Sequence, residues 1–200
     1  MNDLEFLGFA EAVGPLEPVS YQYFNQLINH RTIVLNAGID EEILETVVLP
    51  LKEFEEDNIS DPVTLIINTP GGSVVDGMLL CSIIDGYKKP LNIIVPSYSC
   101  SMGTIILAAG NNNPNVTKKC YPFSFALLHS GSTYVGGESH TVEDVMDFNK
   151  SMDNAIRDYI VKNTNITEEE YTEHYRKQWY MDAKTMLEKG LVDEIIGSEA

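Results

Sequence analysis

Ser101 is the first residue in this sequence whose position favours nucleophilic chemistry. It lies between an apolar, β-branched run at 91–95 and a short, almost wholly apolar segment of helical type at 101–109. Ligands bind beyond the carboxyl ends of strands in open α/β sheets, which is where Ser101 falls. A serine nucleophile also needs a base and donors for the developing oxyanion, and the N–H of Met102 at the helix start is one such donor. A plain helix-capping serine is the alternative interpretation.

Two further segments supply the other groups that acyl transfer requires. The first is Thr-Pro-Gly-Gly-Ser at 69–73, which follows an apolar run at 63–68. The N–H groups of its two glycines are candidate oxyanion donors, and a simple turn is the alternative interpretation. The spacing matches no phosphate-binding glycine motif. His129 follows an apolar run at 123–128 and is a candidate base, although a histidine at a strand end often has a structural role. The remaining histidines show no metal-ligand spacing.

The apolar patterns predict the elements that must position these residues. Strands are predicted at 31–36, 63–68, 91–95 and 123–128, and helices at 41–57, 73–88 and 101–109. Pro50 should bend or break the helix predicted at 41–57. This alternation predicts an α/β fold with a mostly parallel, buried sheet.

The C-terminal third is predicted to be helical. A long amphipathic helix is expected at 141–162, with an apolar stripe that could pack on its own domain or on a neighbouring molecule. A second helix is expected to start at Thr167, and Asp182 is expected to cap a third that ends at Gly190.

Composition excludes several classes of function. The chain has 200 residues and a formal net charge of −17, which disfavours binding to nucleic acid or to an anionic membrane surface. No apolar run is long enough to span a bilayer, and the first twenty residues contain no base, so we expect no secretory signal. The odd number of cysteines, three, favours a reducing, cytoplasmic compartment. We expect a single domain over 1–200 with an irregular arm at 1–20.

Four ordered motifs resemble those of the proteolytic subunits of Clp proteases, the ClpP family. They are INTPGGSVVDGM at 67–78, SCSMGTIILAAG at 99–110, FALLHS at 125–130 and GLVDEII at 190–196. The resemblance extends over about residues 21–197, with 111–114 as a short insertion. It implies a crotonase-like α/β head with a protruding helical handle at about 130–165.

The resemblance also implies a role for each candidate site residue. Ser101 would be the nucleophile, His129 the general base, and the N–H groups of Gly72 and Met102 the oxyanion hole. The family's acidic third residue aligns with Gln178, whose carbonyl can orient an imidazole but cannot stabilise imidazolium by charge. Asp182 is the fallback for this position, although capping is its expected role. Ser130 and the residues after it replace a proline-containing segment of the family.

The implied activity is hydrolysis of peptide bonds in unfolded polypeptides, by a serine endopeptidase enclosed in a homo-oligomer of two stacked heptameric rings. An ATP-dependent AAA+ unfoldase would feed it and would hold the ATP, so we expect no cofactor or metal in this chain. A weakened subunit with a mainly structural role remains an alternative. A coenzyme-A thioester enzyme of the enoyl hydratase/isomerase type and a membrane-tethered signal-peptide peptidase are further alternatives from other classes.

Overall fold

The structure is a computed structural model that describes residues 27–131, 136–174 and 176–198. The chain divides into two compact units, Met1–Thr32 and Ile33–Ala200. The described part of the first unit is a helical turn in which the N–H of His30 donates to the Leu27 carbonyl at 3.0 Å. The arm expected at 1–20 lies outside the described residues.

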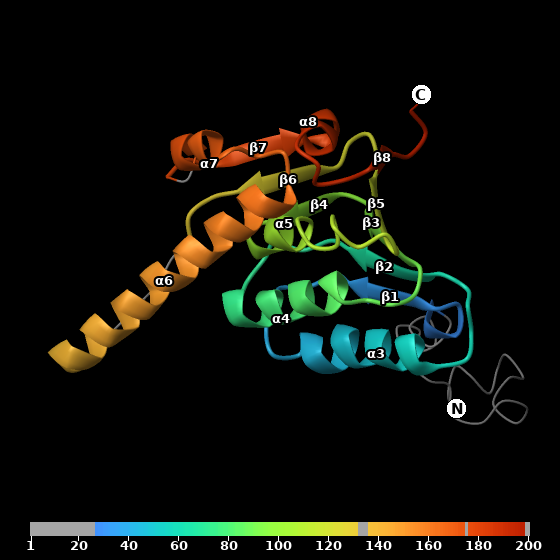
Figure 1. Ribbon diagram of the computed structural model, residues 1–200, viewed down its shortest axis with the longest axis horizontal. Helices are drawn as coiled ribbons and strands as arrows, with labels where there is room; N and C mark the ends of the chain where they lie inside the picture. The colour runs from blue at the N-terminus through green and yellow to red at the C-terminus, as the bar shows by residue number, and fades with distance from the viewer. Residues whose placement is uncertain (1–26, 132–135, 175, 199–200) are drawn as a thin grey trace, which may run out of the picture. The chain divides into compact units, whose positions relative to one another are not determined.

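A five-stranded sheet forms the centre of the fold, in the order β1-β2-β3-β5-β8 (Figure 1). The pairs β2–β3, β3–β5 and β5–β8 are parallel, which confirms the mostly parallel α/β fold. Alternate residues of β2 and β3 are buried, so one row of side chains from each strand packs into the core. The strands are β1 (Thr32–Leu35), β2 (Val63–Ile67), β3 (Leu91–Val95), β5 (Val116–Cys120) and β8 (Glu194–Ile195).

A second, three-stranded sheet was not expected from the sequence. It consists of β4 (Tyr98–Cys100), β6 (Phe125–Leu128) and β7 (Trp179–Asp182). β4 and β6 are parallel, whereas β6 and β7 are antiparallel. This sheet brings three distant segments of the chain together, and each of them contains or adjoins a candidate site residue.

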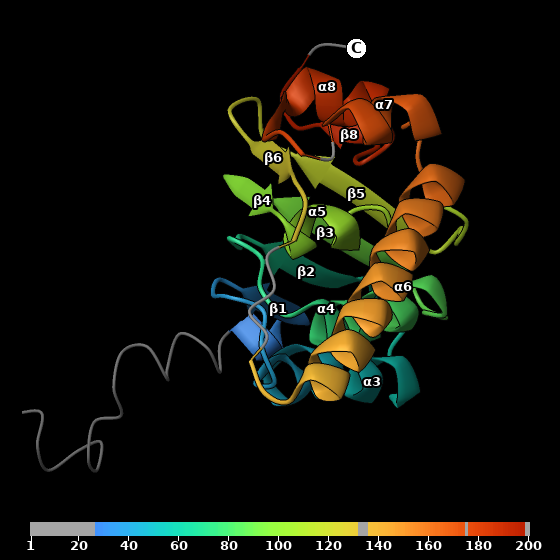
Figure 2. The same cartoon turned by 90° about the vertical axis from the view of Figure 1, so that its left-hand side faces the viewer.

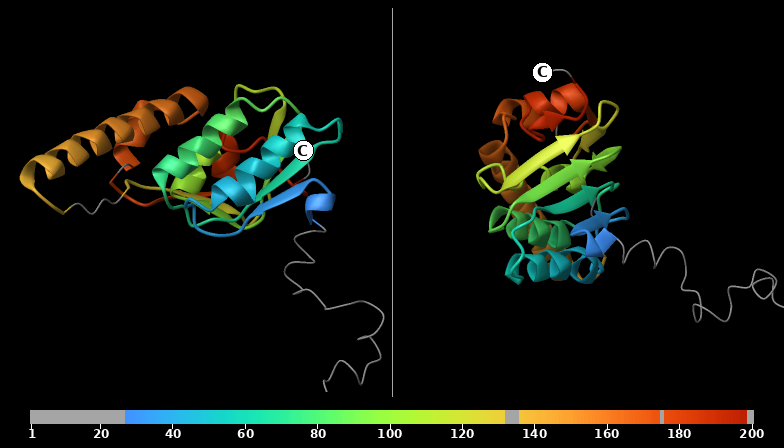
Figure 3. Two further views of the ribbon diagram at one scale, coloured as in Figure 1. Left: turned by 90° about the horizontal axis from the view of Figure 1, so that it is seen from below. Right: turned by 90° about the vertical axis from the view of Figure 1, so that its right-hand side faces the viewer.

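Pro50 is accommodated by a change of helix type rather than by a break. The segment Leu44–Val48 is π-helical, and α3 (Leu49–Glu56) follows it directly with Pro50 in the first turn. The Leu49 N–H still donates to the Leu44 carbonyl in the π-helical pattern, so Pro50 lies where the hydrogen-bond pattern changes from one helix type to the other. α3 runs beside α4 (Val74–Asp85), as the views in Figure 1 and Figure 3 agree.

The remaining helices are α5 (Met102–Ile106), α6 (Ser139–Asn163), α7 (Glu168–His174) and α8 (Ala183–Glu188). α6 is the protruding helix of the handle region, and its first half extends past the sheets (Figures 1 and 2). Ile156 and Ile160 are buried within the unit, but Met146 in the first half is 55% exposed. The apolar stripe therefore packs on its own domain in one half only. No helix among the described residues is long and apolar enough to cross a membrane.

Candidate active site

Ser101 occupies a strained turn between β4 and α5. Its φ of 54° and ψ of −121° lie where residues with a side chain are seldom found. Such a conformation costs roughly 1–3 kcal/mol and persists only where surrounding contacts enforce it. The Ser101 N–H donates to the Leu127 carbonyl at 2.7 Å, which fastens the turn to β6. A sharp strand-to-helix turn of this kind presents the serine Oγ away from the backbone.

Helix capping does not account for Ser101. Its side chain accepts no hydrogen bond from the first turn of α5. Ser73, by contrast, caps α4 by accepting from the Asp76 N–H at 3.4 Å. The plain capping interpretation of Ser101 is therefore wrong, and its hydroxyl is left for another role.

The glycine loop after β2 packs directly on the Ser101 turn. The Cys100 N–H donates to the Thr69 carbonyl at 2.9 Å, and the Gly71 N–H donates to the Thr69 Oγ1 at 3.1 Å. Gly71 has a φ of +96°, and a Cβ there would lie 2.7 Å from the Ser101 Cβ and 2.9 Å from the Met102 nitrogen. Because only glycine permits this approach, the two motifs depend on each other for their geometry.

Ser101, His129, Gly72 and Met102 line one cavity of about 230 Å³. The structure thus brings together the four residues expected to act in acyl transfer, from the ends of β4, β6 and the loop after β2. Within the described part of the chain, the N–H groups of Gly72 and Met102 donate to no protein acceptor. Both N–H groups are therefore available to a bound oxygen. Apolar neighbours in the cavity wall are Val74, Ile105, Leu128 and Ile156.

The two candidates for the third catalytic position lie at opposite ends of the β6–β7 ladder. The pairs run from Leu128 opposite Trp179 to Phe125 opposite Asp182. Gln178, which precedes Trp179, is therefore at the His129 end of the ladder. Asp182 is four residues farther along, roughly 13 Å at a rise of about 3.3 Å per residue.

Asp182 is committed to capping, as expected. Its Oδ1 accepts from the Thr185 N–H at 2.8 Å and from the Thr185 hydroxyl at 2.7 Å. These hydrogen bonds hold the pKa of the Asp182 carboxyl below its ordinary value.

Gln178 has a different partner. Its Oε1 accepts from the Tyr180 hydroxyl at 2.9 Å, and the side chain is exposed. Among the described side chains, His129 forms no hydrogen bond with Gln178 or Asp182, and neither candidate lines the Ser101 cavity.

Asp153 is a carboxylate of the site that the sequence interpretation missed. It extends from α6 and lines the same cavity as Ser101 and His129. Its spacing in the sequence could have indicated this position. Asp153 precedes the buried Ile156 by three residues and therefore lies on the same side of the helix.

A buried lysine fastens the segment that follows α5. The Lys118 ammonium donates to the carbonyls of Leu107 and Ala109, the latter at 3.1 Å, and to the Asn111 side chain. Burial lowers the pKa of this ammonium to about 8, although Asp193 and Asp85 oppose the shift.

The three cysteines are free and buried, which separates them from the chemistry of the site. Burial raises the pKa of the Cys81 thiol to about 12 and that of Cys120 to about 11, and it also raises the pKa of Cys100. Since the thiolate is the reactive form, none of them is an activated nucleophile. No group of three or more histidine, cysteine or acidic residues in the described segments is arranged to hold a metal ion.

The fold and this cavity define a mixed α/β protein in which a serine on a strained strand-to-helix turn shares a pocket with a strand-end histidine. The sequence profile of the Clp protease family matches residues 16–199, and the chain belongs to this family. The chain is 23% identical over 177 residues to an ATP-dependent Clp protease proteolytic subunit from Deinococcus radiodurans, covering 88% of this chain and 85% of the relative. Its role is that of a peptidase.

Proposed function

We propose that the chain is a serine endopeptidase in which Ser101 attacks the peptide carbonyl and His129 takes the serine proton. The N–H groups of Gly72 and Met102 stabilise the oxyanion that forms on the carbonyl oxygen. His129 then returns the proton to the leaving amine as the carbon–nitrogen bond breaks. Water, deprotonated by His129, hydrolyses the acyl-enzyme and restores Ser101.

One observation carries this proposal. Ser101 has a backbone conformation that costs energy, and its side chain does not cap α5. It lines one cavity with His129, Gly72 and Met102, and the N–H groups of the last two have no acceptor among the described residues. A purely structural serine would gain nothing from this strain. Gln178 at the His129 end of the β6–β7 ladder replaces a charged orienting group by a neutral one, so we expect slower turnover than an acidic residue would give.

We further propose that the peptidase works as a homo-oligomer of two stacked heptameric rings that receives unfolded polypeptides from an ATP-dependent AAA+ unfoldase. The relative's name describes the proteolytic subunit of an ATP-dependent protease, and in this proposal the unfoldase, not this chain, holds the ATP. The exposed first half of α6 offers an apolar surface for contact between rings. Free cysteines favour a reducing, cytoplasmic location.

Hydrolysis of a fluorogenic peptide by purified protein tests the chemistry. We expect Ser101→Ala to lower turnover by at most about 10⁶-fold, the cost of losing the serine of a complete triad. Ser82→Ala is the matched control, because Ser82 is exposed on α4 and its hydroxyl donates to the Met78 carbonyl of the same helix. Retention of more than a few per cent of activity in Ser101→Ala would overturn the assignment of the nucleophile.

A further inference from the structure

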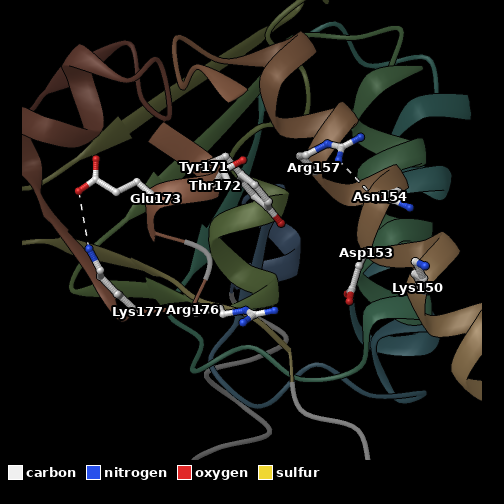
Figure 4. A pocket seen from close by; sticks show the side chains of 9 residues that line it. All are labelled: Lys150, Asp153, Asn154, Arg157, Tyr171, Thr172, Glu173, Arg176 and Lys177. Carbon is white, nitrogen blue, oxygen red and sulfur yellow. Dashed lines mark hydrogen bonds and ion pairs between the residues drawn. The ribbon is translucent and has the colours of Figure 1, made fainter. Parts of the chain in front are cut away.

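A second cavity, of about 610 Å³, lies between α6 and α7, and most of the charged side chains that line it are basic. Figure 4 shows side chains from both helices and from the segment after α7 directed toward it. The charged residues in its lining are Lys150, Arg157, Arg176 and Lys177, with Asp153 and Glu173. Four of the chain's 13 basic residues thus meet in one cavity of a protein whose net charge is −17.

Two of these cations are neutralised by neighbours. Arg157 donates to the Asp158 carboxylate at 2.7 Å, and Lys177 lies 3.6 Å from that of Glu173. Lys150 and Arg176 differ, because neither forms an ion pair or hydrogen bond within the described parts of the chain. Arg176 extends toward the α6 side of the cavity, where Lys150 lies (Figure 4). These two cations are therefore left for a ligand.

The cationic cavity adjoins the cavity that contains Ser101 and His129. Asp153 and Tyr171 line both of them, so the two share a wall. A polypeptide held at Ser101 could therefore extend part of its length between α6 and α7.

We propose that this cavity is a subsite for carboxylate-bearing residues of the peptide substrate, held by Lys150 and Arg176; this inference rests on the proposed peptidase function. A guanidinium presents a planar pair of donors to a carboxylate, and an ammonium adds a point charge. The surrounding net charge repels acidic peptides, so a local pair of free cations is needed to retain them.

Kinetics with two short peptides test this subsite. The peptides are identical except at one position, where one has glutamate and the other has glutamine. We expect wild-type protein to prefer the glutamate peptide in kcat/KM, mainly through a lower KM. In Lys150→Gln with Arg176→Gln, the ratio of the two kcat/KM values should fall about five-fold, the size expected for two partly exposed ion pairs. Added salt should reduce the wild-type preference. Lys162→Gln, on the same helix outside the cavity, should keep the wild-type ratio.

Binding measured without turnover separates this inference from the peptidase assignment. Fluorescence anisotropy of both labelled peptides on Ser101→Ala should show the same preference, and the added Lys150→Gln and Arg176→Gln changes should remove it. Equal binding of both peptides to Ser101→Ala, or a double variant that changes sedimentation but not peptide preference, would overturn the subsite. Failure of wild-type protein to hydrolyse either peptide would instead overturn the peptidase function.

Discussion

Gly71 and Ser101 are in such close contact that a Cβ on Gly71 would lie 2.7 Å from the Cβ of Ser101 and 2.5 Å from the Cys100 carbonyl oxygen. The glycine loop and the serine turn are separated by about thirty residues, yet each determines the position of the other. A loop that cradles a serine in this way also fixes the direction of the neighbouring N–H of Gly72.

Gly71→Ala should therefore disturb both the fold and the chemistry. The substituted residue would have to retain a φ of +96° and displace backbone atoms, so we expect the free energy of unfolding to fall by about 1–3 kcal/mol. Peptide turnover should fall further than stability alone explains. Gly136→Ala is the control, because a Cβ at Gly136 would meet no atom of the described residues within 4 Å. Denaturant unfolding and peptide hydrolysis would show equal effects of both variants if the contact were unimportant.

Gln178→Asp should raise peptidase activity. In serine proteases, replacing the triad aspartate by its amide costs about 10⁴ in turnover through the wrong histidine tautomer. A carboxylate at position 178, at the His129 end of the β6–β7 ladder, should recover part of such a loss, and we expect a gain of about ten-fold. The measurement is kcat for a fluorogenic peptide, with unchanged sedimentation.

Asp182→Asn is the companion variant for this prediction. Because asparagine also caps helices well, it should cost about 1 kcal/mol or less of stability and leave kcat nearly unchanged. If Asp182→Asn were inactive and Gln178→Asp left kcat unchanged, Asp182 would be the residue that orients His129, and Gln178 would not.

Lys118 should make stability depend on pH in the alkaline range. Its pKa is lowered from 10.5 to about 8 by burial, so between these values the unfolded chain binds the proton that the folded chain has lost. The free energy of unfolding contributed by this group should thus rise with pH across that window, by at most about 3 kcal/mol. Lys118→Met should lack this rise. Parallel pH profiles for wild type and variant would contradict the assignment.

The exposed half of α6 should mediate assembly. Val142→Asp with Met146→Asp places two charges on one side of this half, where a buried interface charge costs about 3–5 kcal/mol. We expect the wild-type particle to split into smaller ones in analytical ultracentrifugation. Ser151→Asp adds an exposed charge on the opposite side of α6 and should leave the particle intact. An unchanged sedimentation coefficient for the double variant would show that the stripe takes no part in assembly.

The sequence predicted the strands whose apolar runs are continuous. β2 and β3 appear as Val-Thr-Leu-Ile-Ile and Leu-Asn-Ile-Ile-Val, and such runs indicate buried parallel strands. β5 was missed because Lys118 and Lys119 interrupt its pattern. The Lys118 ammonium is nevertheless buried, since nearby carbonyl oxygens accept its hydrogen bonds, and this compensation depends on tertiary contacts.

The site also combines features that the sequence predicts with features that depend on tertiary contacts. Strand-end positions were enough to select Ser101 and His129 as candidates, because parallel strands end at one edge. The positive φ of Ser101 could not be predicted, since it depends on Gly71 and on the hydrogen bond to Leu127. Asp153 was also missed, because only the packing of α6 brings it to the cavity.

Covalent labelling with a fluorophosphonate tests the central claim most directly. The Ser101 Oγ should attack phosphorus and displace fluoride while His129 accepts the serine proton, leaving a stable phosphonylated serine. Peptide mass spectrometry should then find the adduct on Ser101, with peptidase activity lost in proportion, and His129→Ala should label far more slowly. Loss of activity with the adduct on another serine, or continued hydrolysis after Ser101 has been fully phosphonylated, would contradict the account.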